Sequence, residues 1–591
     1  MDYPRRLFVK FVLLLLPFIA YSQTYKLDDV VISSKRDLSG PFFTTDVETI
    51  KSFEEAGNEK LVDVLETLPG VSINQSGAPG QQATIRIRGS EGRHVLVLVD
   101  GVRVNDPTDP NKSFNPALLN VGDVERVEVL KGAQTLLYGS DAIGGVVNII
   151  TKKGSEKDYI TLSAGYSRGI QLDNTFTFGD SVLHTHIFHD KAEGISAANG
   201  EDEDDGYENK GFTLNLFHSF NEKFEGDWTF KVTDQFSDTD NVDFSTGVPI
   251  DADGDYAKNI QQVFSQKLNY KTSSGKLSHL LGLNKIDRFN KYGSSIVGSY
   301  GKELTNEIHW NQKVENGSYL LGLENYSESF SQDDLDEKYT GLTSLVLIRD
   351  YKEGPVFGQL GARASYHTEA ESNFSPSIGL GKFYGDHRVA FNYQQGFKAP
   401  TLYQLYGPFS TGNNELDAET SEYVDLNYSY KKLFELSLFY NRIDDFIGFE
   451  GNYINTDWLE SYGLEINSQK NIGAYELNSG LFLASFNQAD GKKALRRPSQ
   501  KVTFGVGRDF GEGQSLRISY VWSGKRFDRL KTNGETLELD PYSLVDVHYE
   551  RSFKDFTLNT GIENAFGEDY KEAFGYAVQP FTVYGRVKYS Y

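Results

Sequence analysis

Apolar and polar residues alternate through most of the chain. From residue 154 to the last residue, apolar side chains recur at every second position, for example at Trp228, Phe230 and Val232. Gly, Asn, Asp and Ser separate these segments. A period of two places alternate side chains on opposite faces of a sheet. The second part of the sequence therefore predicts many β-strands, each with one apolar and one polar face.

The number of strands follows from the length of this region. Residues 154–591 accommodate about 22 strands if a membrane-spanning strand and its connection take about 20 residues. Barrels of that size in outer membranes carry a plug in the lumen. A soluble β-sandwich or propeller array is the alternative, but the chain shows no repeat of about 40 residues. Val583–Tyr591 also ends on an aromatic residue in strand phase, as outer-membrane barrels do.

The part before residue 154 has a different pattern. Leu61, Val64, Leu65 and Leu68 recur at the spacing of one helix face, which predicts a helix within Asn58–Leu68. Short strands are predicted at Ala83–Gly89, His94–Asp100, Val102–Val104 and Val124–Leu130. The His94–Asp100 segment is apolar at consecutive positions, which is typical of a strand buried on both faces. Together these elements predict a small α+β domain.

The N-terminus reads as a secretory signal peptide. Arg5 and Arg6 precede an apolar stretch from Leu7 to Ala20, and small residues follow at the positions that a signal peptidase requires. The alternative is a transmembrane anchor, but the stretch is shorter than the ~20 residues that a spanning helix needs. We therefore expect residues 1–22 to be removed on export.

Composition excludes some classes of function. The chain carries 83 acidic and 59 basic residues, whereas a nucleic-acid binder needs a basic face. It has no cysteine, so neither disulfides nor thiolate metal sites are expected. It has 10 histidines, and no HExxH motif marks an outer-membrane protease. We expect no catalytic activity.

Long ordered motifs give the sequence a family resemblance. The motifs before residue 154 are Leu68–Gly89, His94–Asp106 and Val124–Lys153, and those after it are Gln394–Gly407, Asn413–Glu422 and Glu563–Tyr570. The chain resembles the TonB-dependent outer-membrane receptors. The resemblance implies an all-β transmembrane barrel of about 22 antiparallel strands, with an N-terminal α+β plug domain in its lumen. It divides the chain into a signal peptide (1–22), a TonB-box segment with linker (23–45), a plug (46–153) and a barrel (154–591).

The resemblance also assigns a partner to the segment after the signal peptide. An extended β-branched segment can add a strand to a partner's sheet, and the stretch from Leu27 to Ser34 resembles the TonB box. It implies TonB, with its inner-membrane energising complex, as the partner. The residues expected to bind it are Leu27, Asp28, Asp29, Val30, Val31, Ile32 and Ser33. The alternatives are a disordered tail or a first plug strand.

The arginines of the first domain are candidates for ion pairs. Arg86, Arg88, Arg93, Arg103 and Arg126 are many cations for a small domain, and we predict that they pair with carboxylates of the barrel wall. The alternative is solvated charge, because a wet lumen screens such pairs.

Acidic residues also gather in two early loops. Calcium takes 6–8 oxygen ligands in flexible geometry, and cobalamin receptors of the family bind calcium in early extracellular loops. We therefore predict a structural calcium site, with an acidic solvated loop as the alternative. The candidate ligands are Asp202, Glu203, Asp204, Asp205, Asp238, Asp240 and Asp243.

The resemblance is strongest to the cobalamin receptor, so a corrinoid is the expected ligand. The short chain, the plug motifs and the acidic loops favour it. A ferric siderophore or haem receptor is the alternative, and a passive porin or adhesin barrel is the alternative of another class. A surface lipoprotein and outer-membrane lipid are further expected partners, in a Gram-negative outer membrane. By analogy with the family, the substrate contacts are Asn74, Gln75, Ser76, Gln81, Asn105, Asn111 and Phe114.

Overall fold

A computed structural model gives the fold of the chain. It describes residues 47–51, 60–77, 80–154, 158–198, 203–243, 248–408, 411–431, 433–489, 491–529 and 536–591. The predicted signal peptide, the predicted TonB box and Asp202 lie outside these residues.

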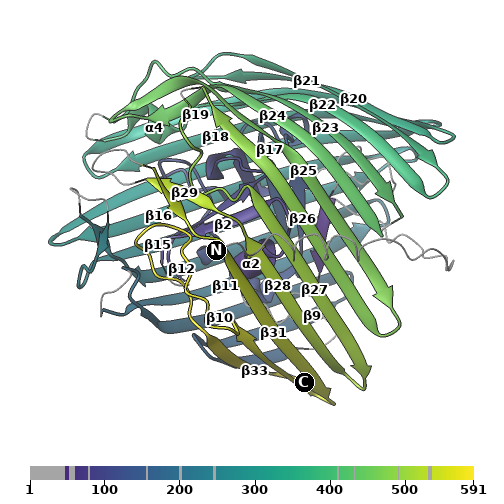
Figure 1. The fold of residues 1–591 in the computed structure, drawn as a ribbon. Coiled ribbons are helices and arrows are strands. Elements are labelled where there is room, and N and C mark those ends of the chain that lie inside the picture. Colours follow the sequence, from purple (N-terminus) through teal and green to yellow (C-terminus); the bar gives the residue numbers. More distant parts are fainter. Residues whose placement is uncertain are drawn as a thin grey trace, which may run out of the picture.

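Twenty-two antiparallel strands form one closed barrel, which confirms the predicted fold class (Figure 1). The strands are β8 (Tyr159–Ala164), β9 (Arg168–Phe178), β10 (Ser181–Ile195), β11 (Asp205–Asn221), β12 (Phe224–Asp238), β15 (Tyr256–Lys271), β16 (Gly275–Tyr292), β17 (Ser295–Val314), β18 (Gly317–Gln332), β19 (Leu335–Glu353), β20 (Val356–His367), β21 (Asn373–Tyr384), β22 (His387–Lys398), β23 (Glu419–Tyr430), β24 (Phe434–Phe449), β25 (Tyr453–Ile472), β26 (Tyr475–Gln488), β27 (Gln500–Gly511), β28 (Gln514–Ser523), β31 (Tyr542–Phe553), β32 (Phe556–Glu563) and β33 (Thr582–Ser590). β33 pairs with β8 and closes the cylinder, so the aromatic C-terminal segment is a barrel strand.

The sequence alternation separates the two faces of the wall. In β18, Leu321 and Leu323 point outward and are 54% and 49% exposed, whereas Glu324 and Tyr326 point into the lumen and are buried. The apolar residues thus cover the outside of the cylinder and the polar residues line its bore. No helix in the described part of the chain is long and apolar enough to span a membrane.

The two ends of the barrel differ. At the end that carries the C-terminus, successive strands are joined by short turns of two or three residues. At the opposite end most connections are longer and contain further elements: β13 (Asn241–Val242), β14 (Pro249–Ile250), α4 (Leu402–Tyr406), β29 (Arg526–Arg529) and β30 (Thr536–Leu539). In outer-membrane barrels the short turns are periplasmic and the long loops extracellular.

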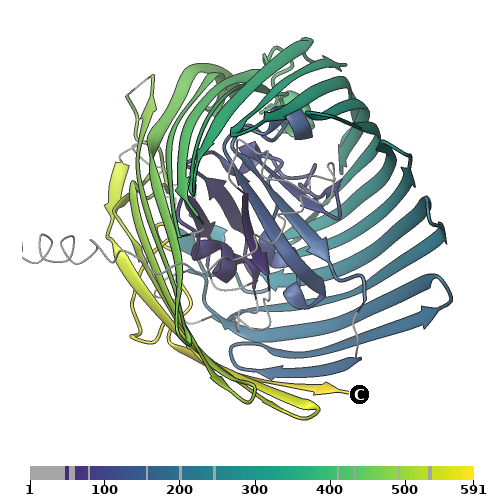
Figure 2. The same cartoon turned by 90° about the vertical axis from the view of Figure 1, so that its right-hand side faces the viewer.

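The N-terminal domain lies inside the barrel (Figure 2). Its elements are β1 (Val47–Lys51), α2 (Leu61–Glu66), β2 (Val71–Gln75), β3 (Ala83–Ile87), η1 (Gly92–His94), β4 (Val95–Val99), β5 (Val102–Arg103), η2 (Pro116–Leu118), η3 (Val121–Asp123), β6 (Val124–Lys131), α3 (Thr135–Tyr138) and β7 (Gly145–Thr151). Five strands form a sheet in the order β1-β6-β7-β4-β5, in which only β4 and β7 run parallel, and β2 and β3 form a separate hairpin. The predicted helix and strands are all present, with ends shifted by a few residues.

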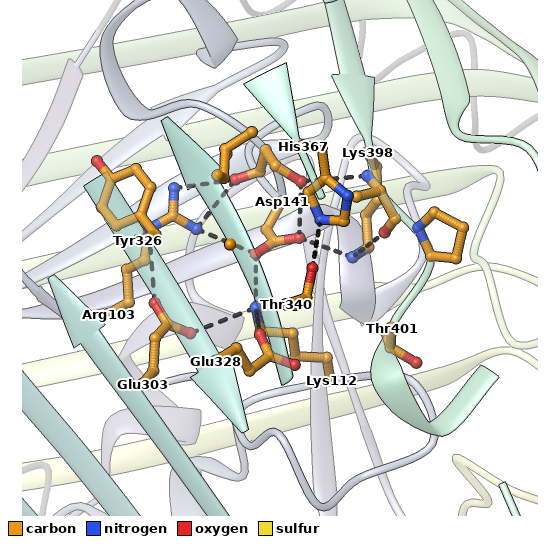
Figure 3. Close-up of a pocket in the computed structure, with 15 residues that line it drawn as sticks. Arg103, Lys112, Asp141, Glu303, Tyr326, Glu328, Thr340, His367, Lys398 and Thr401 are labelled. Atoms are coloured by element: carbon orange, nitrogen blue, oxygen red, sulfur yellow. Dashed lines mark hydrogen bonds and ion pairs between the residues drawn. The ribbon is translucent and has the colours of Figure 1, made fainter. Parts of the chain in front are cut away.

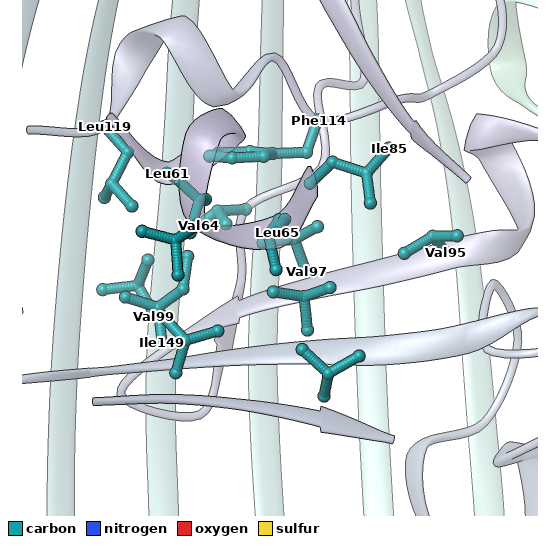
Figure 4. Packing of buried hydrophobic residues seen from close by; sticks show 14 of the residues in the cluster. Leu61, Val64, Leu65, Ile85, Val95, Val97, Val99, Phe114, Leu119 and Ile149 are labelled. Atoms are coloured by element: carbon teal, nitrogen blue, oxygen red, sulfur yellow. The ribbon is translucent and has the colours of Figure 1, made fainter. Parts of the chain in front are cut away.

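The surroundings of the central strand β4 explain why its sequence is uniformly apolar. Val95, Val97 and Val99 pack with α2 in one core (Figure 4). Leu96 and Leu98 point the other way and join a second core with α3 and the inner faces of β18 and β19. The prediction of a strand buried on both faces is therefore confirmed. One face stabilises the plug itself and the other attaches the plug to the barrel wall.

Candidate functional site

Buried ion pairs join the plug to the barrel wall. Arg88 pairs with Glu465 at 3.2 Å, and Arg93 pairs with Glu419 at 2.8 Å. Both arginines also lie over aromatic rings of the wall, Phe439 and Phe446 respectively. These contacts confirm that plug arginines pair with carboxylates of the wall.

Two of the five arginines behave differently. Arg86 pairs with Glu91, and Arg126 pairs with Glu125 at 2.7 Å and Glu128 at 3.0 Å, so both form ion pairs within the plug. For these two the prediction of a barrel partner was wrong. Charge alone does not distinguish an arginine at the plug surface from one whose carboxylate neighbour belongs to its own strand or loop.

The largest charged cluster lies where the plug meets β17, β18 and β22 (Figure 3). The plug contributes Arg103, Lys112 and Asp141, and the wall contributes Glu303, Glu328 and Lys398. Asp141 is central: its carboxylate lies 3.0 Å from Arg103, 3.1 Å from Lys112 and 2.7 Å from Lys398. The six groups, here named the plug–wall cluster, carry three positive and three negative charges.

Mutual attraction stabilises the ionised forms of Asp141 and Lys112 in this cluster. Burial by itself raises the pKa of Asp141, but Lys112, Lys398 and Arg103 together hold that pKa well below its ordinary value. Burial lowers the pKa of Lys112, and Asp141, Glu303 and Glu328 more than reverse this, so its pKa lies well above the ordinary value. Removing one partner leaves the others buried without compensation, which is costly. Lys112, Asp141 and Lys398 were not singled out by sequence.

Three predicted substrate contacts have structural roles. The Asn105 side chain is buried, accepts a hydrogen bond from Val97 N–H at 2.8 Å and donates to the carbonyl of Val95 at 3.0 Å. The Asn74 carbonyl accepts from Arg86 at 2.8 Å. Phe114 lies in the plug core. These three side chains stabilise the plug, and little of their surface faces the long-loop end.

The other four predicted contacts lie at the plug apex. Asn111 is exposed, and Gln75 and Ser76 are half-buried. Gln81 is buried, and its side-chain amide donates a hydrogen bond to the Asp238 carbonyl at 2.6 Å. The apex is thereby attached to the end of β12, at the edge of the acidic loops.

Carboxylates of the two acidic loops converge at the long-loop end. Carboxylate oxygens of Glu203, Asp240 and Asp251 lie within 4.8 Å of one another. Asp251 belongs to the sequence DADGD and was not among the predicted ligands. Sequence spacing does not reveal it because β13 and β14 pair and bring Asp251 back toward Asp240.

Other predicted ligands support the loops around this group. Asp205 accepts a hydrogen bond from Ala197 N–H at 2.6 Å, and Asp238 accepts one from Gly206 N–H at 3.2 Å. Asp204 is exposed, and Asp243 lies where β13 ends. The predicted set is therefore divided: Glu203 and Asp240 lie in the converging group, and Asp205 and Asp238 hold backbone beside it.

The converging carboxylates raise one another's affinity for a positive charge. Burial and the neighbouring Asp205 raise the pKa of Asp240 to about 7. Burial, Asp205 and Asp251 raise the pKa of Glu203 as well. Three hard oxygen donors at this separation suit calcium, which takes carboxylate oxygens at 2.3–2.6 Å. A proton is the other means of relieving the repulsion.

The last long loop, residues 564–581, covers the plug apex. Glu572 accepts a hydrogen bond from Gln75 N–H at 2.7 Å, and Lys60 donates to Gln579 at 3.1 Å. Ala577 N–H donates to the carbonyl of Ala197, beside the acidic loops, at 2.8 Å. This loop therefore contacts both the plug and the loop that precedes Glu203.

A closed barrel with a separately folded domain fixed in its bore defines a plugged outer-membrane receptor. Residues 35–146 match the model of the TonB-dependent receptor plug domain, and residues 150–565 match that of the TonB-dependent receptor-like β-barrel. The chain belongs to the TonB-dependent receptor family, and it is a transport receptor of the outer membrane.

Solved structures share the whole fold. The siderophore receptor PirA of Acinetobacter baumannii superimposes with a TM-score of 0.81 at 16% identity, covering 92% of this chain and 98% of PirA. The ferric enterobactin receptor PfeA of Pseudomonas aeruginosa gives 0.80 at 17% identity, covering 92% and 98%. The siderophore receptor PiuA of A. baumannii gives 0.78 at 15% identity, covering 96% and 99%. At this identity the likeness establishes the fold.

Proposed function

We propose that this receptor imports a ferric siderophore, with energy delivered through TonB. The observation that carries active import is the plug, because buried ion pairs fix it to the wall inside the bore. A barrel closed in this way does not serve as a passive porin, so the plug has to move. The siderophore class is supported by the similar solved structures, whose names give siderophores as their ligands. This replaces the corrinoid as the first substrate to test.

A corrinoid is the second candidate, and the acidic loops favour it. The group Glu203, Asp240 and Asp251 lies beside the plug apex, and Gln81 connects that apex to Asp238. This arrangement supports a cation site in the early extracellular loops, which the resemblance to the cobalamin receptor leads us to expect. The plug motifs that carry the same resemblance span most of the plug.

We propose calcium as a structural cofactor, whichever ligand is imported. Glu203, Asp240 and Asp251 would supply oxygen ligands, and water or backbone carbonyls would complete the shell. A bound cation would relieve the repulsion that raises the pKa of Asp240. It would hold the backbone of Ala198, because Ala198 N–H donates to the Asp240 carboxylate.

The proposed TonB contact is the segment from Leu27 to Ser33. A surface lipoprotein stays a predicted further partner. Deleting residues 27–34 should abolish energised uptake and leave ligand binding unchanged, because the deletion removes only the strand offered to TonB. Uptake that survives the deletion would contradict TonB-dependent import by this segment.

Titration of the purified receptor decides between the two substrates. Ferric enterobactin and cobalamin are each titrated by calorimetry, in detergent, with calcium and with a chelator. Tight binding of ferric enterobactin alone supports the siderophore proposal. Tight binding of cobalamin alone overturns it in favour of the corrinoid, and binding that weakens in chelator supports the calcium site as well.

A further inference from the structure

The wall formed by β25 to β28 contacts the plug in its upper rows but not in its lower rows. At its upper rows the plug contacts it directly. Lys501 donates to the carbonyl of Val71 at 2.7 Å and pairs with Glu66 at 3.1 Å. Pro69 lies so close to Gly480 that a Cβ at Gly480 would be 2.7 Å from the proline ring. Lys501 and Gly480 therefore face the lumen, beneath α2 and β2.

Lower down, the same face of the wall is polar and open. Side chains two positions apart on a strand share a face, and hydrogen-bonded neighbours across strands share a row. These rules and the observed register define a lumen-facing polar strip: Glu476 and Asn478 of β26, Gly505 and Gly507 of β27, and Arg517 and Ser519 of β28. The strip begins four residues below Lys501 on β27 and continues toward the short-turn end.

The polar groups of the strip bond to the wall itself. Asn478 donates to Glu476 at 3.3 Å, Ser519 donates to Asp546 at 3.4 Å, and Arg517 pairs with Glu476 at 3.4 Å. Asn478 is exposed although it faces the bore, whereas Glu465, higher on the same wall, is only 2% exposed. A Cβ at Gly505 would meet no atom closer than 3.7 Å. The described residues of the plug thus cover the upper rows and leave the strip uncovered.

A hollow of about 710 Å³ adjoins this strip at the short-turn end. Glu476, Gly507 and Arg517 line it, together with Ser515 and Glu550. Its volume lies within the 300–1,000 Å³ of small-molecule sites.

The neighbouring wall at β20 to β22 is sealed. The plug helix α3 packs against β20, β21 and β22. Leu136 of α3 fills the space beside Gly361, and it joins Leu320 and Val346 of the wall in one apolar core. Opening this side would expose apolar surface, at a cost of about 25 cal/mol for each Å². Opening the β27 side requires the release of polar contacts that water can replace.

We propose that the imported chelate crosses the lower half of the barrel along the polar strip and leaves through the adjoining hollow. In this route the α2–β2 segment is the gate, and its contacts with Lys501 hold the gate closed. The proposal rests on the proposed import function. The two glycines of the strip leave room for a solute because they have no side chain. The amide, hydroxyl and charged groups of the strip offer hydrogen bonds that replace those of water.

The test places a bulky side chain at Gly505. Gly505→Trp should reduce uptake of radiolabelled ferric enterobactin or cobalamin by about tenfold, because passage depends on the width of the pore. Binding at the extracellular side should stay within about twofold, because the substitution lies below the plug. The matched control is Gly585→Trp on β33: nothing lies within 4 Å of that position, and its neighbours Val583 and Val587 on the same face are 57% and 42% exposed on the outside.

Each outcome has a separate meaning. Uptake by Gly505→Trp at the level of the unsubstituted receptor overturns the route. Loss of uptake in both variants overturns it too, because the effect then does not depend on the lumen face. If Gly505→Trp fails to assemble, Gly505→Cys is labelled after assembly with a bulky maleimide, which is selective because the chain has no other cysteine. If the unsubstituted receptor imports neither chelate, the proposed function fails and the route with it.

Discussion

Two regions of the molecule gather charge in opposite ways. In the plug–wall cluster, three carboxylates face three cations of the same chain, and the pairs that Asp141 makes lie at 2.7 to 3.1 Å. In the acidic loops, Glu203, Asp240 and Asp251 face one another. The groups that shift the pKa of Asp240, after burial, include Asp205, Asp251 and Glu203.

The difference indicates what each region needs. The plug–wall cluster is complete within the chain, so it holds the plug in the absence of any ligand. The acidic loops are complete only when a cation or a proton arrives. A half-buried group of like charges is stabilised by whichever of these binds it in the folded state alone. The first region is therefore suited to fix a structure, and the second to respond to the surroundings.

The largest effect is expected of Asp141→Asn, which removes the central negative charge of the plug–wall cluster. The substitution leaves Arg103, Lys112 and Lys398 around a neutral amide, and an uncompensated buried charge costs about 3–5 kcal/mol. Asparagine is chosen because Asp141 has a φ of 76°, which asparagine tolerates better than alanine. We expect the plug to become protease-sensitive at a lower urea concentration, measured by limited proteolysis along a urea series.

An exposed ion pair is the control for that experiment. Arg168 and Glu193 lie 2.6 Å apart, but their side chains are 68% and 80% exposed. Glu193→Gln should cost no more than about 1 kcal/mol, because solvent screens the pair. A shift for Asp141→Asn as small as that for Glu193→Gln would show that the cluster does not anchor the plug.

The next effect is the response of the acidic loops to calcium. A ligand at 100 times its dissociation constant stabilises the state that binds it by about 2.7 kcal/mol. We expect calcium to slow proteolysis of the loops around Asp240 and Asp251, and a chelator to reverse this. Asp240→Asn should remove most of the response, because it deletes one of the three converging carboxylates.

Asp204→Asn is the matched control for the calcium experiment. Asp204 lies in the same loop, next to Glu203, but its side chain is exposed and outside the converging group. It should retain the calcium response of the unsubstituted receptor. Equal loss in both variants would indicate that calcium acts on the net charge of the loop, and no change in either would contradict the site.

The fold followed from the sequence because its signals are local and repeated. The alternation around Leu321 and Leu323 recurs from strand to strand, so strand number could be derived from length. The uniformly apolar sequence of β4 also predicted burial of the strand on both faces. The exact ends of elements were less accessible: α2 is described from Leu61 to Glu66, shorter than the predicted stretch, because Thr67 already caps it.

The site followed less well, because it depends on contacts between distant residues. Asn105 and Phe114 have residue types that suit a ligand, yet Asn105 bonds to β4 and Phe114 fills the plug core. Asp251 was missed since only the pairing of β13 with β14 brings it to Asp240. Lys398 was missed because its partner, Asp141, is 257 residues away. No spacing rule links such positions.

The smallest effect is expected at Glu572, a buried carboxyl group whose charge is neutralised by a proton. Burial, and next the nearby Glu66, raise the pKa of Glu572 to about 8, although Arg526 and Lys501 oppose the shift. Tyr542 and Tyr570 also face this group. The folded chain thus keeps a proton that the unfolded chain releases near pH 4.5. The stability from this proton is complete below pH 4.5 and is lost as the pH rises through about 8.

We therefore expect the loop of residues 564–581 to loosen from Gln75 as the pH rises toward 8. Ionised Glu572 repels Glu66, so cleavage of this loop by a protease should rise between about pH 4.5 and about pH 8, by no more than about tenfold per pH unit, and level off at higher pH. Glu572→Gln keeps the acceptor for Gln75 N–H but has no proton to lose, so the ratio of its cleavage rate to that of the unsubstituted receptor isolates the titration. A ratio that stays constant across this pH range would mean that Glu572 is ionised throughout.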